Sequence, residues 1–124
     1  PHPSGNGIAI QQLLKLFLLT GEDTYRSAAE TALRVFAPGA PELGLHAGTY
    51  YCGLDAWFRT LKITVEADPE SDLARVSRGL AGAAAVIAYG ADRGRVIPCV
   101  NQSCSPPITD PARIGPVLAS LMRR

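Results

Sequence analysis

The spacing of apolar residues changes near Leu61, and this change constrains the fold more than any other feature of the sequence. Before it, apolar residues recur every three or four positions, which is the period of an amphipathic helix. From Leu61 to Glu66, in the stretch LKITVE, they alternate with polar residues, which is the period of a half-buried strand. We therefore predict an α+β chain, with a helical segment over residues 1–60 and a small αβ section over residues 61–124.

The helical segment is predicted to contain a hairpin and a third helix. IAIQQLLKLFLLT, from Ile8, and EDTYRSAAETALRVFAPG, from Glu22, are separated by Gly21, a residue suited to ending a helix. A third helix is predicted from Pro41 to Thr60, although three glycines weaken it. The first helix is apolar almost all the way round, so it requires neighbours on more than one side. This pattern is typical of the end of an α-solenoid or of an α/α toroid, which is a ring of helical hairpins.

The αβ section is predicted to follow the order β-α-β-β-α. The second strand, AAAVIAY ending at Tyr89, is entirely apolar and is therefore predicted to be central. The third strand runs from Val96 to Val100, where Pro98 predicts an edge position. The first helix of this section is predicted to start at the cap Asp68, and the last to begin at Pro116 after a separate turn.

Composition narrows the classes of protein that fit. The 124 residues are 47% apolar and 19% charged with a net charge of +1, which fits one compact unit with a modest core. This balance argues against nucleic-acid and membrane-surface partners, and no apolar run reaches the roughly 18 residues of a membrane span. Three cysteines favour a reducing compartment, which we expect to be the cytoplasm. Because the chain lacks an initiator Met, we expect a C-terminal piece of a longer protein.

Cys99 and Cys104 are the first candidate site residues. The four residues between them can form a turn that brings two Cβ atoms within disulfide distance. Three alternatives remain open: packed thiols, which we favour because no Lys, Arg or His lies between the two; a disulfide or redox pair; and a metal site. Metal is the weakest of these, because short ligand pairs are absent, so we assign no metal site. Cys52, on the third helix, is expected to be inert.

Three further residues are candidate ligand contacts. Ser4 and Asn6 precede the first helix, where a side-chain oxygen is expected to cap free N–H groups, and where Asn6 could alternatively bind a sugar hydroxyl. His46 lies one predicted helical turn from Glu42 and Tyr50, so a carboxylate could orient it as a base, although a structural role is the simpler interpretation. The turn EADPESD is acidic and has no Gly-rich phosphate loop, so we predict no nucleotide and assign no cofactor.

Several stretches resemble one known family. PSGNG before an apolar helix, then LTGEDTYRSAAETALRVFAP, and finally CVNQSCSPPITDP occur in the order seen at the C-terminal end of the spermatogenesis-associated, thioredoxin-domain-containing proteins. The family pattern has Ser where this chain has Gly7, and a plain final helix where this chain has Gly115 and Pro116.

This resemblance implies an architecture and several partners. It implies that a thioredoxin-like domain and most hairpins of a six-hairpin toroid, similar to that of N-acylglucosamine 2-epimerases, lie elsewhere in the same protein. It implies a structural portion with no turnover of its own; whether the whole protein is an enzyme stays open. A carbohydrate-processing enzyme and a redox or interaction module using the cysteine pair are the alternatives. A carbohydrate ligand and a second copy of the chain are the further candidate partners.

Overall fold

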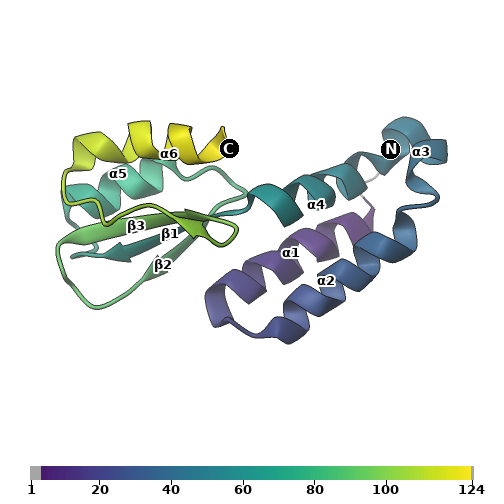
Figure 1. Cartoon of the computed structure of the whole chain (residues 1–124), viewed down its shortest axis with the longest axis horizontal. Helices are drawn as coiled ribbons and strands as arrows, with labels where there is room; N and C mark the ends of the chain where they lie inside the picture. Colours follow the sequence, from purple (N-terminus) through teal and green to yellow (C-terminus); the bar gives the residue numbers. More distant parts are fainter. Residues whose placement is uncertain (1–3, 124) are drawn as a thin grey trace. The chain divides into compact units, whose positions relative to one another are not determined.

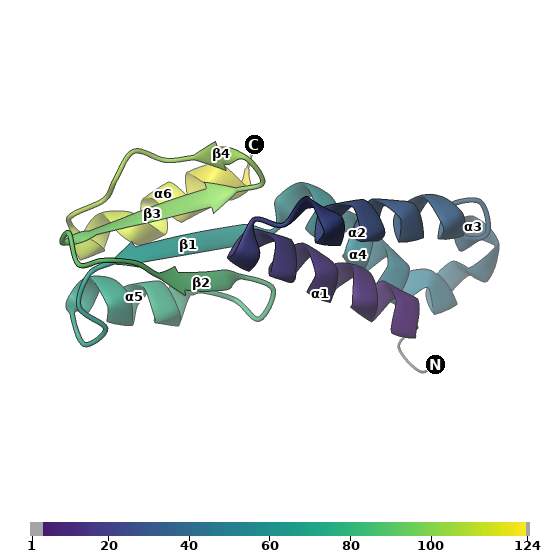
Figure 2. The same cartoon turned by 90° about the horizontal axis from the view of Figure 1, so that it is seen from below.

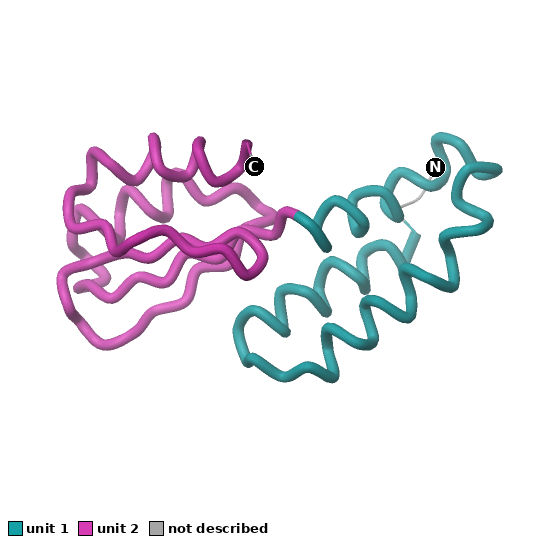
Figure 3. Tube along the Cα trace, in the orientation of Figure 1, with its two compact units in different colours: residues 1–58 teal, residues 59–124 magenta. Residues whose placement is uncertain are grey.

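Helices precede strands along the chain, as the change of hydrophobic period predicts (Figure 1). The structure is a computed structural model that describes residues 4–123. It confirms the α+β class and places the first strand at Leu61. Instead of the one compact unit that we expected, the chain forms two, residues 1–58 and residues 59–124, which we call the helical unit and the αβ unit (Figure 3).

The helical unit is built on the predicted hairpin of α1 (Gly5–Thr20) and α2 (Asp23–Phe36). Gly21 ends α1 with a left-handed φ of 76°, and its N–H donates to the carbonyl of Phe17 at 2.8 Å. The apolar face of each helix meets that of the other, which forms a core of four buried residues. They are Ile10, Leu14, Ala29 and Leu33.

The third helical segment is not one continuous helix, and here the prediction is wrong. It consists of α3 (Ala40–Leu43), the 3-10 turn η1 (Gly44–Ala47) and α4 (Gly48–Arg59). Gly44 has a φ of 52°, which is incompatible with an α-helix, so the chain changes direction there. Helix α4 then packs on α1, with Leu54 and Trp57 against the hairpin core.

The αβ unit contains a four-stranded mixed sheet in the order β2-β1-β3-β4. Strand β1 pairs in parallel with β2 and antiparallel with β3, so β1 is central and the wholly apolar β2 is an edge strand, contrary to our prediction. The order β-α-β-β-α is otherwise found, with β4 added. The strands are β1 (Leu61–Glu66), β2 (Val86–Tyr89), β3 (Arg95–Val100) and β4 (Ser103–Cys104).

Pro98 lies in a strand that has neighbours on both sides, so the edge position that we predicted for β3 is wrong. Val96 exchanges two backbone hydrogen bonds of 2.8 Å with Ile108, on the side of β3 away from β1. Because strand residues alternate in the direction of their N–H and C=O groups, Pro98 faces that same side. Its carbonyl there accepts from the N–H of Ser105 at 2.9 Å. The missing N–H of Pro98 therefore removes no bond to β1.

Helices α5 (Asp72–Leu80) and α6 (Ile114–Met122) lie on the same face of the sheet (Figures 1 and 2). The inward residues Ile63 and Val65 of β1 are fully buried beneath them. The opposite face, which we call the open face, carries no helix of the αβ unit. The core beneath the helices comprises Leu61, Ile63, Val65, Ala67, Leu73, Ala74, Val96, Ile108, Ile114 and Leu118.

Of the two helices of the αβ unit, α5 begins later than predicted and α6 begins earlier. Ser71, and not Asp68, caps α5, because its Oγ accepts from the N–H of Ala74 while Asp68 forms the preceding turn. A separate turn, η2 (Pro111–Arg113), does precede α6, as predicted. Helix α6 then begins at Ile114, before Pro116, because a proline in the first turn of a helix removes no internal hydrogen bond.

Candidate functional site

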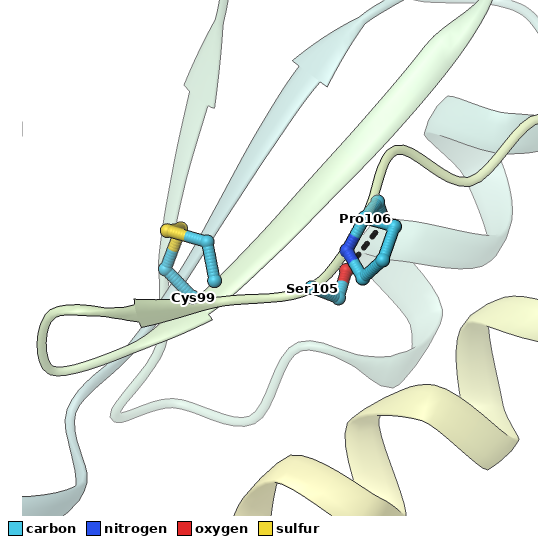
Figure 4. Close-up of a disulfide and its surroundings, with 4 residues drawn as sticks. Cys99, Ser105 and Pro106 are labelled. Atoms are coloured by element: carbon cyan, nitrogen blue, oxygen red, sulfur yellow. Dashed lines mark hydrogen bonds between the residues drawn. A yellow bond between two sulfur atoms is a disulfide. The ribbon is translucent and has the colours of Figure 1, made fainter.

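Cys99 and Cys104 form a disulfide between β3 and β4 (Figure 4). The two residues face each other in the antiparallel register, with their Cα atoms 4.0 Å apart. Asn101 makes the tight turn between the strands possible, because its φ of 53° is one that Asn tolerates better than most residues. Of the three alternatives left open by the sequence, the structure has the disulfide, and the packed free thiols that we favoured are not found.

The two sulfur-bearing residues differ in exposure. Cys104 is exposed, whereas Cys99 is half-buried between β1 and β4. The next residue, Ser105, still pairs with β3, because its N–H donates to the carbonyl of Pro98, and its hydroxyl donates to the carbonyl of Pro106 at 2.8 Å (Figure 4). A thiolate approaching from solvent therefore reaches the Cys104 side of the disulfide more easily than the Cys99 side.

Lys62 is the residue of this site that the sequence did not reveal. It pairs with Cys99 in the β1–β3 register, so both side chains project from the open face of the sheet. Directly opposite residues in an antiparallel pair have Cβ atoms about 5 Å apart. The alternation in LKITVE did indicate that Lys62 faces away from the core, but only the strand register shows that Cys99 lies beside it.

A pocket of about 160 Å³ in the helical unit brings together all three predicted ligand contacts. Ser4 and Asn6 approach it from the start of α1, and His46 from η1. Most of the remaining wall is apolar and includes Val35 and Phe36, from the end of α2. The pocket is thus formed by segments far apart in the sequence, all of them in one compact unit.

The polar groups of this pocket are only partly engaged in hydrogen bonds. The N–H of Ser4 donates to Oγ1 of Thr49 at 2.9 Å, and the hydroxyl of Tyr50 donates to the carbonyl of Leu33 at 3.2 Å. Ser4 occupies the cap position of α1, but its side chain accepts no capping hydrogen bond. Asn6 lies inside the first turn and is exposed. The expectation that a Ser4 or Asn6 oxygen caps α1 is therefore wrong.

His46 is exposed at the wall of the pocket. The predicted relation to Glu42 assumed one continuous helix, and that assumption fails because α3 ends at Leu43 and the 3-10 turn follows. No hydrogen bond joins Glu42 to His46 within the described chain. A carboxylate-oriented histidine base is therefore not formed here, and His46 remains a pocket-wall residue next to Tyr50.

The cysteines offer no assembled metal site. Cys99 and Cys104 cannot act as thiolate ligands while they are joined, and Cys52 is an exposed free thiol on α4. Within residues 4–123, no three His, Cys, Asp or Glu side chains converge in a way that would hold a metal ion. The possible chemistry of the cysteine pair is therefore thiol–disulfide exchange.

Comparison with known proteins finds no matching family model, curated protein or solved structure. None of the helices in the described part of the chain has both the length and the apolar character needed to span a bilayer.

Proposed function

We propose that this chain is the C-terminal portion of a thioredoxin-domain and helical-toroid protein, and that its αβ unit presents a disulfide for exchange with a thioredoxin-like domain. The observation that carries the proposal is the accessible disulfide at the end of β3, with Cys104 exposed to solvent. The order of elements, a helical hairpin followed by a small αβ unit, supports the toroid assignment. By itself the chain is a structural portion and a redox substrate, with no turnover.

The proposed exchange transfers two electrons and involves two thiolates of the partner. The first partner thiolate attacks Sγ of Cys104, the Sγ–Sγ bond breaks, and Cys99 leaves as a thiolate. The second partner thiolate then attacks the partner sulfur of the mixed disulfide, and Cys104 leaves. The partner dithiol becomes a disulfide, and the Cys99–Cys104 disulfide becomes two thiols.

The proposed cytoplasmic location fits a disulfide that cycles. Stable structural disulfides are rare in reducing compartments, where those that form are usually transient and redox-active. In the cytoplasm the pair would therefore be reduced and reoxidised. The reducing partner would be the thioredoxin-like domain of the same protein.

Reduction by a dithiol protein tests the proposal directly. The full chain, oxidised, is mixed with a reduced thioredoxin, its reductase and NADPH, and NADPH consumption is followed. We expect one equivalent of NADPH per chain, and two new thiols detectable by maleimide labelling. The variant Cys99→Ser with Cys104→Ser is the control and should consume none. Failure of thioredoxin to reduce the wild-type disulfide, under conditions in which dithiothreitol does so, would overturn the proposal.

A second candidate function is carbohydrate binding in the toroid part of the protein. The supporting observation is that Ser4, Asn6 and His46, separated in the sequence, line one pocket together with Tyr50. Hydroxyl, amide and imidazole groups can hydrogen-bond to sugar hydroxyls, and the apolar and aromatic wall can contact the face of a sugar ring. The proposal places a sugar against Asn6, as part of an epimerase-like enzyme.

Thermal shift with common mono- and disaccharides tests this second candidate. We expect a saccharide-dependent rise in the melting temperature of the helical unit that Asn6→Ala abolishes. Gln12→Ala is a matched control, because Gln12 is an exposed side chain of α1 that does not line the pocket. Absence of a shift at millimolar concentrations of every sugar would count against the carbohydrate ligand.

The helical unit also supports the proposal that other hairpins or a second copy of the chain cover it. Several of its apolar side chains are exposed, among them Leu45 at 95% and Val35 at 66%. Scattered exposed apolar residues are normal, but residues 35–45 bring several into one region. Light scattering at several concentrations should reveal dimers, and a strict monomer would contradict the second-copy partner.

A further inference from the structure

The open face of the sheet places one cation beside the disulfide. Lys62 of β1 is directly opposite Cys99 of β3, and Cys99 is in turn opposite Cys104 of β4. These three side chains therefore form a row across three strands, with the half-buried Cys99 in the middle. No carboxylate among residues 4–123 forms a salt bridge with Lys62.

The other charged groups on this face of β1 and β3 are paired with each other and lie far from Lys62. Glu66 and Arg95 face each other across β1 and β3 and form a salt bridge. Glu66 lies four residues from Lys62 along β1, which is about 13 Å in a strand, and Arg95 lies opposite Glu66. Between them the same face carries the uncharged pair Thr64 and Ile97. On the strands that flank Cys99, the ionisable groups facing it are thus Lys62 from β1 and Cys104 from β4.

We propose that Lys62 stabilises the thiolate that forms at Cys99, so that Cys99 is the sulfur that leaves and Cys104 the sulfur that is attacked. A cation next to a thiol favours the thiolate, and a better-stabilised thiolate leaves faster in exchange. Solvent exposure favours the same order of attack, because Cys104 is the exposed cysteine of the disulfide. This inference rests on the exchange proposed above, and Lys62 acts in it as a charge-stabilising residue.

A small dithiol such as dithiothreitol reduces the disulfide in two exchange steps. One of its thiolates bonds to Sγ of Cys104 while the Sγ–Sγ electron pair passes to Cys99, whose thiolate then lies beside Lys62. The second thiolate of the reagent closes the oxidised ring and releases Cys104 as a thiolate. Because dithiothreitol has no protein docking surface, its rate depends on the disulfide site and not on recognition by a partner protein.

An ammonium and a thiolate on directly opposite strand residues at a protein surface interact strongly enough to change a rate several-fold. We therefore expect Lys62→Gln to slow reduction of the disulfide by dithiothreitol at pH 7 by about three- to tenfold. The difference should shrink at 1 M salt, where the Debye length falls to about 3 Å. Lys62→Arg keeps the charge and should restore most of the rate.

The experiment uses the full chain in a Cys52→Ser background, so that no third thiol interferes. Arg93→Gln is the matched control, because it removes one positive charge two residues before β3, beyond the end of the strand that is away from Cys99. Brief exposure to glutathione followed by acid quenching and peptide mass spectrometry should find the adduct on Cys104. An adduct mainly on Cys99 would overturn the assigned polarity.

A pH profile separates this electrostatic role from a structural one. In the variant with Cys52→Ser and Cys104→Ser, Cys99 is the single thiol, and its alkylation by iodoacetamide is followed from pH 6 to 10. We expect Lys62→Gln to move the pH of half-maximal rate upward, and Lys62→Arg to leave it near that of the parent.

The inference is overturned if Lys62→Gln and Arg93→Gln have equal effects on both the reduction rate and the pH profile. That outcome differs from failure of the proposed function, in which dithiothreitol reduces the disulfide with the expected dependence on Lys62 while thioredoxin does not reduce it at all.

Discussion

At the scale of single residues, the absence of a side chain at Gly7 decides how closely α1 and α4 approach. A Cβ at Gly7 would lie 2.5 Å from both the carbonyl carbon and the carbonyl oxygen of Thr49, closer than real Cβ atoms come. The neighbouring Gly5 has no heavy atom within 4 Å of the same position. The two glycines of PSGNG therefore have different roles, although they look alike in the sequence.

This difference gives the first prediction. Gly7→Ala should destabilise the helical unit by about 1–3 kcal/mol, because the backbone of Thr49 must move to accommodate the methyl group. Gly5→Ala should be neutral or slightly stabilising, since Ala is the better helix residue and space is open there. Guanidinium unfolding followed by the fluorescence of Trp57, the only tryptophan, measures both. Equal effects of the two substitutions would contradict the close packing.

At the scale of elements, capping decides where α5 begins. The stretch DPESD offers Asp68, Ser71 and Asp72 as caps, and the sequence alone favours Asp68 before a proline. In the structure Oδ1 of Asp68 accepts from the N–H of Glu70 and forms a turn, and Ser71 caps the helix. The hydroxyl of Ser71 also donates to the carbonyl of Asp68 at 2.6 Å.

The second prediction follows from these bonds. Ser71→Ala should lower the free energy of unfolding of the αβ unit by about 1 kcal/mol, through loss of the helix cap. Ser120→Ala, at an exposed position inside α6, is the control and should change stability by only a few tenths of that amount. Hydrogen exchange of the α5 amides is the measurement. Unchanged protection of α5 in Ser71→Ala would show that another residue serves as the cap.

At the scale of the whole molecule, two cores replace the single core expected for a chain of this length. The core of the helical unit centres on Ile10 and Leu33, and that of the αβ unit on Ile63 and Ile114. Each is surrounded by its own elements. The disulfide belongs to the αβ unit, and Trp57 belongs to the helical unit, where the guanidinium of Arg26 lies 5.1 Å from its ring centroid.

The third prediction is that reduction of the disulfide affects one unit only. Opening a loop of this small size should lower the free energy of unfolding of the αβ unit by about 2 kcal/mol. Hydrogen exchange of the β1 amides should report that loss, while the Trp57 fluorescence transition of the helical unit should stay where it is. If reduction shifts the Trp57 transition and also lowers the protection of the β1 amides, the two units unfold cooperatively.

The sequence by itself determined the class of the fold, the switch to strands at Leu61 and the stop at Gly21. These follow from local physics: hydrophobic period and backbone conformation act over neighbouring residues. It also indicated candidate residues that the structure gathers, since Ser4, Asn6 and His46 line one pocket. Only the tertiary structure decided the central strand, the division into two units and the position of Lys62 beside Cys99. Strand order and register depend on pairing between distant segments, and the spacing of residues along one strand carries no information about its partner.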